Sequence, residues 1–188
     1  EIDFALNWLS RNIPDGEGRA CLVHGDIGPG NFIFDDDGNV RALIDWEVAH
    51  MGHPLEDLAA VMCRALGAPF GTGPDHIAAY ERISGETVDR KSLEFLLILV
   101  LTRWYIGLNM GLSHPSNTQN LPAILAYRQS VAFTLVSLLA KHHGIAPATA
   151  EPLPAGESDY IHAYIIHTLD HVLRPAQSDP YLADRASG

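Results

Sequence analysis

Three side chains in one short stretch have the types and spacing that phosphoryl transfer uses. Asp26 follows a His-Gly pair in the segment LVHGDIGPGN, Asn31 comes five residues later, and Asp45 ends a later β-rich run. An ionised carboxylate can accept a proton from an attacking alcohol. An amide and a second carboxylate offer oxygen ligands to Mg²⁺. The remaining coordination positions of the ion can then be filled by phosphate oxygens and water. These residues could therefore hold Mg²⁺ against a phosphate and position a hydroxyl.

Short strands and a hairpin must bring these side chains together. Short β-rich runs are predicted at residues 20–24, 31–34 and 40–44. The tract DDDGN at 35–39 is a strong hairpin signal, and we interpret it as a solvated tip rather than a metal site. A hairpin would bring Asp45 back to the end of the strand pair at which the first strand starts with Asn31. Gly25 keeps the backbone near the carboxylate free of a side chain, and the Gly28–Gly30 segment bends the loop.

The remainder of the chain is predicted to be mainly helical. Helices are expected at residues 2–12, 54–66, 74–84, 89–110, 122–143 and 159–173. Helix 89–110, with Asp89 as its cap, is apolar on more than one face, which predicts a central core helix. A Pro/Ala linker follows residue 145. The expected fold class is α+β, mainly α-helical, with one domain at 1–145 and a linker, an amphipathic helix and a tail at 146–188.

Composition excludes several classes of function. A net charge of −11 and a pI near 5.2 argue against a nucleic-acid partner. Cys21 and Cys63 lack metal-binding spacing and are expected to be free thiols, which fits a reducing cytoplasm. The longest apolar run, 95–101, is far shorter than the roughly 20 residues of a membrane span, so no membrane partner is expected.

The motifs resemble the C-terminal lobe of the aminoglycoside phosphotransferase and choline kinase-like family, which has a protein-kinase-like fold. LVHGDIGPGN is similar to its Brenner-type catalytic loop, and LIDWEVAHMGHPLEDLA to its metal-aspartate segment and following helix. The spacing also follows the kinase pattern H-R-D-x-x-x-x-N with a later metal-binding Asp. Within the family, the chain is most similar to phosphotransferases related to the kinase-like domain of acyl-CoA dehydrogenase family members ten and eleven.

The resemblance covers about residues 1–145 and implies a role for each matching residue. The implied roles are Asp26 as catalytic base, His24 as loop organiser, Asn31 and Asp45 as Mg²⁺ and nucleotide ligands, and Gly25, Gly30, Asp57 and Glu47 as loop support. From the residues alone, we also expect His24 to orient the loop rather than act as a base. Where the family has Gly-Asp-Pro, this chain has Gly52-His53-Pro54, a departure that concerns local loop bonding more than catalysis.

The implied activity is that of a small-molecule kinase that transfers the γ-phosphoryl group of ATP, or of another nucleoside triphosphate, to an alcohol. Such an enzyme needs an N-terminal nucleotide-binding lobe with a phosphate-binding lysine. The only lysines, Lys91 and Lys141, fall in predicted helices after the metal aspartate. We expect that lobe to be absent from this chain, and the chain alone to be inactive. A non-catalytic kinase-like binding module and, more weakly, a metal-dependent phosphohydrolase remain alternatives.

The acceptor is expected between the catalytic loop and the later helices, with Arg103, Trp104 and Asn109 as candidate lining residues. Trp104 is more typical of a core residue. An arginine in so apolar a helix predicts a partner, either a buried carboxylate or an anionic ligand. A cationic aminoglycoside or amino alcohol would suit the acidic composition, and a hydroxyacyl compound would suit Arg103. The sequence does not decide among them, and it leaves room for a homodimer.

Overall fold

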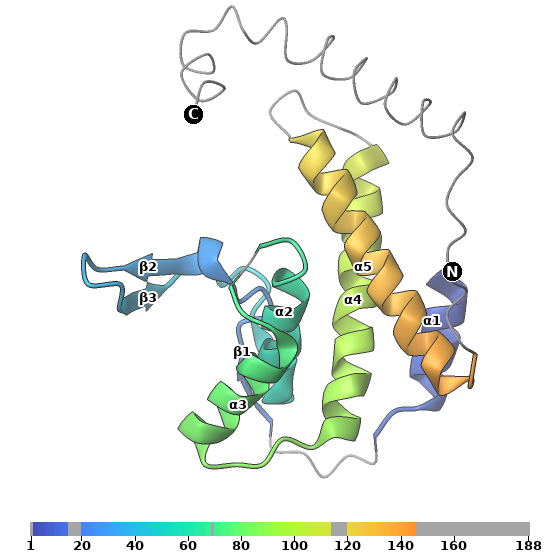
Figure 1. Cartoon of the computed structure of the whole chain (residues 1–188), viewed down its shortest axis with the longest axis horizontal. Coiled ribbons are helices and arrows are strands. Elements are labelled where there is room, and N and C mark those ends of the chain that lie inside the picture. The colour runs from blue at the N-terminus through green and yellow to red at the C-terminus, as the bar shows by residue number, and fades with distance from the viewer. Residues whose placement is uncertain (1, 15–19, 69, 114–119, 146–188) are drawn as a thin grey trace, which may run out of the picture. The chain divides into compact units, whose positions relative to one another are not determined.

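The computed structural model describes residues 2–14, 20–68, 70–113 and 120–145. The chain divides into two units, Glu1–Pro147 and Ala148–Gly188, and every described residue belongs to the first. The predicted linker and the predicted helix at 159–173 lie outside the described residues. The described part is mixed α/β and mostly helical, with two small antiparallel sheets (Figure 1). The coarse fold class is therefore as predicted.

Five α-helices make up most of the described structure. They are α1 (Ile2–Arg11), α2 (Leu55–Arg64), α3 (Gly73–Ser84), α4 (Arg90–Ser113) and α5 (Leu121–His142). Helix α4 packs against α1, α2 and α5, and Ile98, Val100 and Leu101 on it are fully buried. Burial on several faces explains why α4 lacks a single apolar stripe. The prediction of a central core helix is confirmed.

The ends of the helices follow side-chain capping. The Asp89 carboxylate accepts hydrogen bonds from the backbone N–H groups of Lys91 and Ser92, at 3.2 and 3.1 Å, as predicted for the cap of α4. Thr72 and Asp75 form a reciprocal capping box at α3. Such bonds stabilise the ionised carboxyl, so the pKa of Asp89 is lowered, first by the hydrogen bonds from Ser92.

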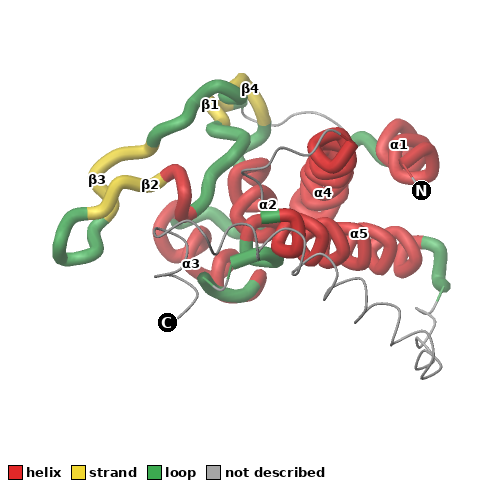
Figure 2. Tube along the Cα trace, turned by 90° about the horizontal axis from the view of Figure 1, so that it is seen from above, coloured by secondary structure: helices red, strands yellow, loops and turns green. Residues whose placement is uncertain are grey.

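Two strand pairs lie beside the helices (Figure 2). Strand β1 (Cys21–Val23) pairs with β4 (His50–Gly52), and β2 (Phe32–Phe34) pairs with β3 (Val40–Leu43) as the predicted hairpin. Strand β4 is a correction, because no strand was predicted between residue 44 and the helix expected from residue 54. A three-residue strand containing a histidine and a glycine carries little β signal of its own. Its pairing partner lies about thirty residues earlier, where Leu22 faces Met51.

Helices α4 and α5 are also long and apolar enough to cross a membrane, by length and composition alone. Core helices that are packed inside a protein meet the same criterion. About a third of the apolar window of α4 is buried, against 17% of that of α5. Exposed apolar side chains on α5 include Phe133 and Val136. The expectation of no membrane partner rested on unbroken apolar runs, and it stays a prediction.

Candidate active site

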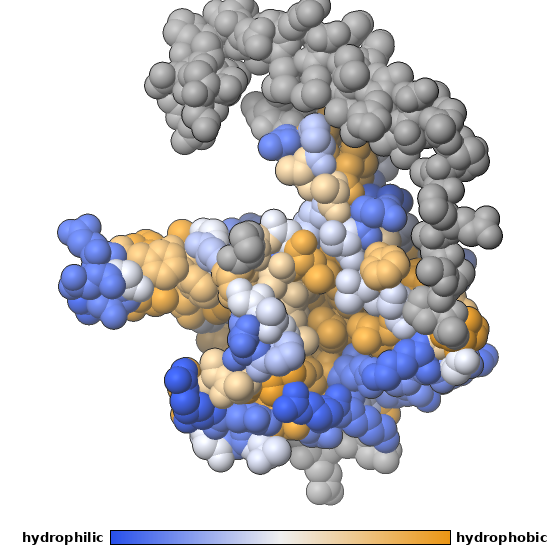
Figure 3. Space-filling model, viewed as in Figure 1, coloured by the Kyte–Doolittle hydropathy of each residue, from blue (hydrophilic) through white to orange (hydrophobic). Residues whose placement is uncertain are grey.

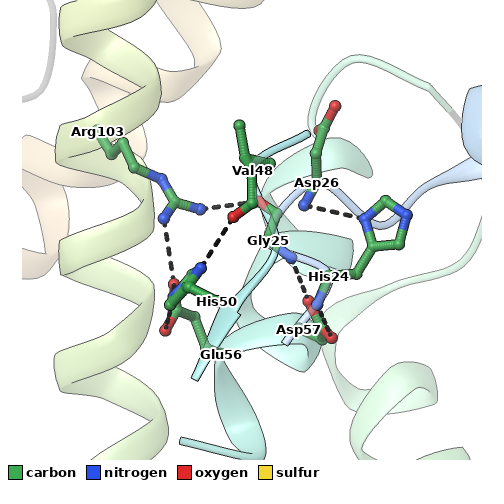
Figure 4. Close-up of polar contacts among 8 residues, drawn as sticks. All are labelled: His24, Gly25, Asp26, Val48, His50, Glu56, Asp57 and Arg103. Atoms are coloured by element: carbon green, nitrogen blue, oxygen red, sulfur yellow. Dashed lines mark hydrogen bonds and ion pairs between the residues drawn. The ribbon is translucent and has the colours of Figure 1, made fainter. Parts of the chain in front are cut away.

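The loop from His24 to Asn31 is fixed by a carboxylate from α2. Asp57 accepts hydrogen bonds from the backbone N–H groups of His24 and Gly25, both at 2.9 Å (Figure 4). One oxygen serves each N–H, so both donors at the end of β1 are satisfied. Asp57 thus fixes the backbone that leads into Asp26.

Gly25 occupies a position that requires glycine. Its φ is +81°, in the left-handed region, and a Cβ here would lie 3.0 Å from the Val48 carbonyl oxygen. The residue is enclosed by Val48 and His50 on one side and bonded to Asp57 on the other. The backbone that leads into Asp26 is therefore held in one conformation.

Asp26 lies directly after this glycine and has partners on both sides. The Asn31 side-chain amide donates to the Asp26 carbonyl at 2.7 Å and to its Oδ2 at 3.2 Å. Arg64 Nη2 lies 2.7 Å from Oδ1. The loop therefore brings Asn31 to Asp26 as the spacing predicted, whereas the arginine was not anticipated.

His24 is buried and both of its ring nitrogens have partners. Nε2 lies 2.9 Å from the Ile44 carbonyl oxygen, and Nδ1 faces the Asp26 backbone N–H at 3.3 Å. These partners assign the proton to Nε2, which donates to Ile44, while Nδ1 accepts. The centre of the ring also lies 4.6 Å from that of the Trp46 ring, with the two planes tilted by 48°. With no nitrogen free, His24 ties the loop to the end of the hairpin and is not placed to act as a base.

Asn31 and Asp45 are brought together by the hairpin. The Ile44 backbone N–H donates to the Asn31 carbonyl at 3.0 Å, so Asp45 follows a residue bonded to Asn31. Asp45 has a φ of 66°, the one positive value outside glycine in the described residues. Such strain often marks a functional position. Glu47 is nearby in the chain and exposed, and no described residue forms an ion pair with it.

The oxygen atoms that Asn31 and Asp45 offer fit a metal ion that binds together with phosphate groups. Asp45 is exposed, and no described residue donates a hydrogen bond to its carboxylate. The Asn31 amide uses its N–H₂ on Asp26, which leaves its oxygen as a ligand. No group of three or more His, Cys, Asp or Glu that could hold a metal ion occurs among the described residues. Mg²⁺ bound with a nucleotide uses only one or two protein carboxylates, so the lack of such a group does not conflict with a site at Asn31 and Asp45.

A second polar network holds the loop from the opposite side. The buried Glu56 carboxylate lies 3.1 Å from Arg103 Nη1 and 3.2 Å from His50 Nε2 (Figure 4). Arg103 Nη2 donates to the Gly25 carbonyl at 2.8 Å. The partner predicted for Arg103 is therefore a buried carboxylate.

Sequence reasoning missed Glu56 and His50. The one signal was the position of Glu56 beside Asp57 on the same helix. His50 Nδ1 donates to the Val48 carbonyl at 2.9 Å, and this bond, followed by the contact with Glu56, raises the pKa of His50 against the opposing effect of burial.

A cavity of about 310 Å³ opens beside Asp26. It is lined by Gly25, Asp26, Val48, Arg103, Trp104, Gly107 and Leu108. Trp104 is half-buried and packs edge-on against Tyr127, so it serves both the core and the cavity wall. Asn109 lies elsewhere, because its side chain bonds the Tyr105 carbonyl and Arg128 on α5.

Comparison with known proteins connects this geometry with a family. A family model described as the phosphotransferase enzyme family matches residues 1–96. The chain belongs to this family. The matched part of the chain contains Asp26, Asn31, Asp45 and Asp57, whereas Arg103 lies beyond it.

Individual relatives match a shorter region. Acyl-CoA dehydrogenase family member 11 of Rattus norvegicus is 46% identical over 59 residues, which are 31% of this chain and 8% of the relative. The Homo sapiens protein of the same name is 43% identical over 53 residues, 28% of this chain and 7% of the relative. Acyl-CoA dehydrogenase family member 10 of Mus musculus is 38% identical over 55 residues, which are 29% of this chain and 5% of the relative. The matches thus span less than a tenth of these relatives.

The chain departs from the expected Gly-Asp-Pro sequence at His53. The backbone N–H of Leu55 donates to His53 Nδ1 at 3.1 Å, and the backbone N–H of Glu56 donates to the His53 carbonyl at 2.9 Å. An imidazole nitrogen here accepts the hydrogen bond that an aspartate oxygen could accept. The substitution therefore concerns the start of α2, as the sequence suggested.

Proposed function

We propose that this chain is the catalytic and acceptor-binding part of a kinase-like phosphotransferase, which uses Mg²⁺ and ATP, or another nucleoside triphosphate, to phosphorylate an alcohol. The observation that supports this most is the position of Asp26. Its carboxylate lines a cavity, and the backbone before it is held by Asp57 from one side and Arg103 from the other. Fixed geometry of this kind is the main requirement of phosphoryl transfer.

Asp26 accepts the proton of the acceptor hydroxyl as that oxygen attacks the phosphoryl group. Asn31 orients the carboxylate through its bond to Oδ2, and His24 ties the loop backbone to the hairpin. Asn31 and Asp45 would hold the metal-bound nucleotide. When bound, the metal neutralises charge on the phosphates.

The cavity favours an acceptor with an apolar body and little charge near its hydroxyl. Val48, Trp104 and Leu108 supply apolar walls. Arg103 is already paired with Glu56, so it is not a free cation for an acidic acceptor. Asp26 is the one carboxylate among the lining residues, which is few for a polycationic aminoglycoside.

The remaining nucleotide contacts are proposed to come from residues outside this sequence. Lys141 pairs with Glu94 at 3.0 Å, and Lys91 lies exposed at the start of α4. Neither is placed to bind a phosphate beside Asp45. The relatives are also far longer than their matched segments, which accords with a chain that works as part of a larger protein.

The test uses a longer protein that contains this chain together with the proposed nucleotide-binding residues, called the longer protein below. Its phosphoryl transfer is screened against neutral alcohols, amino alcohols, hydroxy acids and aminoglycosides. Asp26→Asn should lower kcat by about 10² to 10⁴-fold, because the general base is lost, while circular dichroism stays unchanged. Asp36→Asn, at the exposed hairpin tip, is the matched control and should retain activity. Normal turnover by Asp26→Asn would rule out the assigned base.

A further inference from the structure

Arg64, in the last turn of α2, places a cation directly beside the proposed base. Its Nη2 lies 2.7 Å from Oδ1 of Asp26, and its guanidinium carbon lies 4.8 Å from the centre of the Trp104 ring. Stacking on an aromatic face favours a guanidinium over an ammonium. Arg64 is therefore held by a ring on one side and by the carboxylate at its tip.

The two oxygens of Asp26 differ because of this contact. Oδ1 is buried and accepts no conventional hydrogen bond from the described residues, so its contact with Arg64 is an ion pair without hydrogen-bond geometry. Oδ2 accepts from Asn31 at 3.2 Å. The Asp26 side chain is nevertheless 26% exposed. With Oδ1 buried, Oδ2 is the oxygen that an incoming hydroxyl can reach.

The stem of Arg64 passes against the loop at Gly28. A Cβ at Gly28 would lie 3.1 Å from the Arg64 Cγ and 3.2 Å from its Nε. Gly28 has a φ of 175°, which any residue can adopt, so space for the arginine is what a side chain here would remove. The Nε group is buried and has no hydrogen-bond partner among the described residues. A hydrogen bond from Nε therefore does not explain why the Arg64 side chain lies in this position.

We infer that Arg64 is a positioning residue of the transfer reaction. This inference rests on the proposed function. Arg64 holds Oδ1, so that the carboxylate keeps one orientation and Oδ2 receives the proton. In the step itself, the acceptor O–H bond breaks and its proton goes to Oδ2. A new O–P bond forms, and the bond to the nucleoside diphosphate breaks, which leaves the electron pair on that leaving group.

The experiment measures kcat and KM in the longer protein with the best alcohol found in the screen. Arg64→Ala should lower kcat by about 10 to 100-fold and leave KM for the alcohol within about threefold, because the base is misdirected and the cavity remains. Added guanidinium chloride at millimolar concentration should restore part of the lost kcat. Arg82→Ala, on an exposed face of α3, is the matched control and should match the wild type.

A glycine pair tests the same contact without removing the arginine. Gly28→Ala should lower kcat severalfold, because the new methyl group pushes the Arg64 stem by a few tenths of an ångström. Gly111→Ala is the control, since a Cβ there meets no atom within 4 Å. Both variants should melt within a few degrees of the wild type.

The outcomes separate this inference from the function on which it rests. Transfer by the wild type with an unchanged kcat in Arg64→Ala would overturn the role of Arg64 alone. A loss that guanidinium does not restore, accompanied by a lower melting temperature, would assign Arg64 a structural role instead. A wild-type protein that phosphorylates no alcohol would remove the proposed function and this inference together.

Discussion

At the scale of single residues, Asp57 is the side chain on which the loop geometry depends most. It uses both carboxylate oxygens on consecutive backbone N–H groups, those of His24 and Gly25. An amide offers only one oxygen and places an N–H₂ group against the second donor. An asparagine at this position could therefore accept only one of the two hydrogen bonds that Asp57 accepts.

Asp57→Asn should lower the free energy of unfolding by about 1–3 kcal/mol, because one backbone donor is left without an acceptor. Urea denaturation followed by circular dichroism measures the change. Glu47→Gln makes the same type of substitution at an exposed side chain and should stay within about 0.5 kcal/mol of the wild type. Equal stability of the two variants would contradict the role assigned to Asp57.

The two cysteines, which are free as predicted, should differ in reactivity. Burial raises the pKa of the Cys63 thiol to about 11, whereas Cys21 is only partly buried. A thiol reagent at pH 8 should label Cys21 first and reach Cys63 only in denaturant, because the thiolate is the reactive form. Mass spectrometry of the labelled peptides measures the order. Faster labelling of Cys63 in the folded chain would contradict its burial.

The residues of the motif could be predicted because they lie close together in the sequence. Asp26 and Asn31 are five apart and meet in the structure, as the loop pattern indicated. Arg103 and Gly25 are 78 residues apart, and no local pattern encodes such a contact. Arg64 and Glu56 lie on a helix whose periodicity indicated packing but not which polar groups face the loop. Single-sequence reasoning therefore identified residues that meet in the structure and missed much of what holds them in place.

At the scale of elements, β4 and α2 act together on the loop. His50 in β4 contacts Glu56 in α2, which also binds Arg103 in α4. Two consecutive elements and the distant helix α4 thus meet at one buried carboxylate. Strand β4 was missed for the same reason as the network, since its pairing with β1 is long-range.

This junction makes stability depend on pH. The pKa of His50 is raised above its usual value of about 6.5, so protonated His50 stabilises the folded state below that pH, and the contribution is lost as pH rises through the raised value. Wild-type stability should therefore fall slightly between pH 6 and 8. The effect is small because the His50 side chain is 38% exposed.

Urea denaturation across this pH range measures the effect. His50→Gln should flatten the difference, because the titrating group is gone. Glu56→Gln should flatten it in part, because the Val48 carbonyl, the larger cause of the raised pKa, remains. An undiminished pH difference in His50→Gln would show that other groups cause it.

At the scale of the described unit, apolar side chains remain uncovered around the hairpin. Half-exposed or nearly half-exposed residues include Ile33, Phe34, Val40, Ile44, Trp46 and Val48. Figure 3 shows apolar surface along the projecting hairpin and a hydrophilic tip. The tip is kept polar by Asp35, which pairs with Arg41 at 2.7 Å. Apolar surface of this kind next to Asp45 is suited to being covered by further protein.

Hydrogen exchange can test this. Backbone amides of β2 and β3 should exchange more slowly in the longer protein than in the 188-residue chain, because covering the hairpin protects it. The amides of α4 serve as the internal control and should change little, since α4 is already packed on three helices. Equal exchange of the hairpin in both proteins would mean that no segment covers it.

Helix α2 has one more consequence, for how the sequence can vary. Asp57 holds the loop backbone and Arg64 holds the base, and they are seven residues apart, close to two full turns of an α-helix. The two contacts are therefore in phase. Inserting one residue between them would turn Arg64 about 100° away from the loop, although every side chain would still be present. The length of this helix segment therefore decides whether both contacts with the loop can form at once.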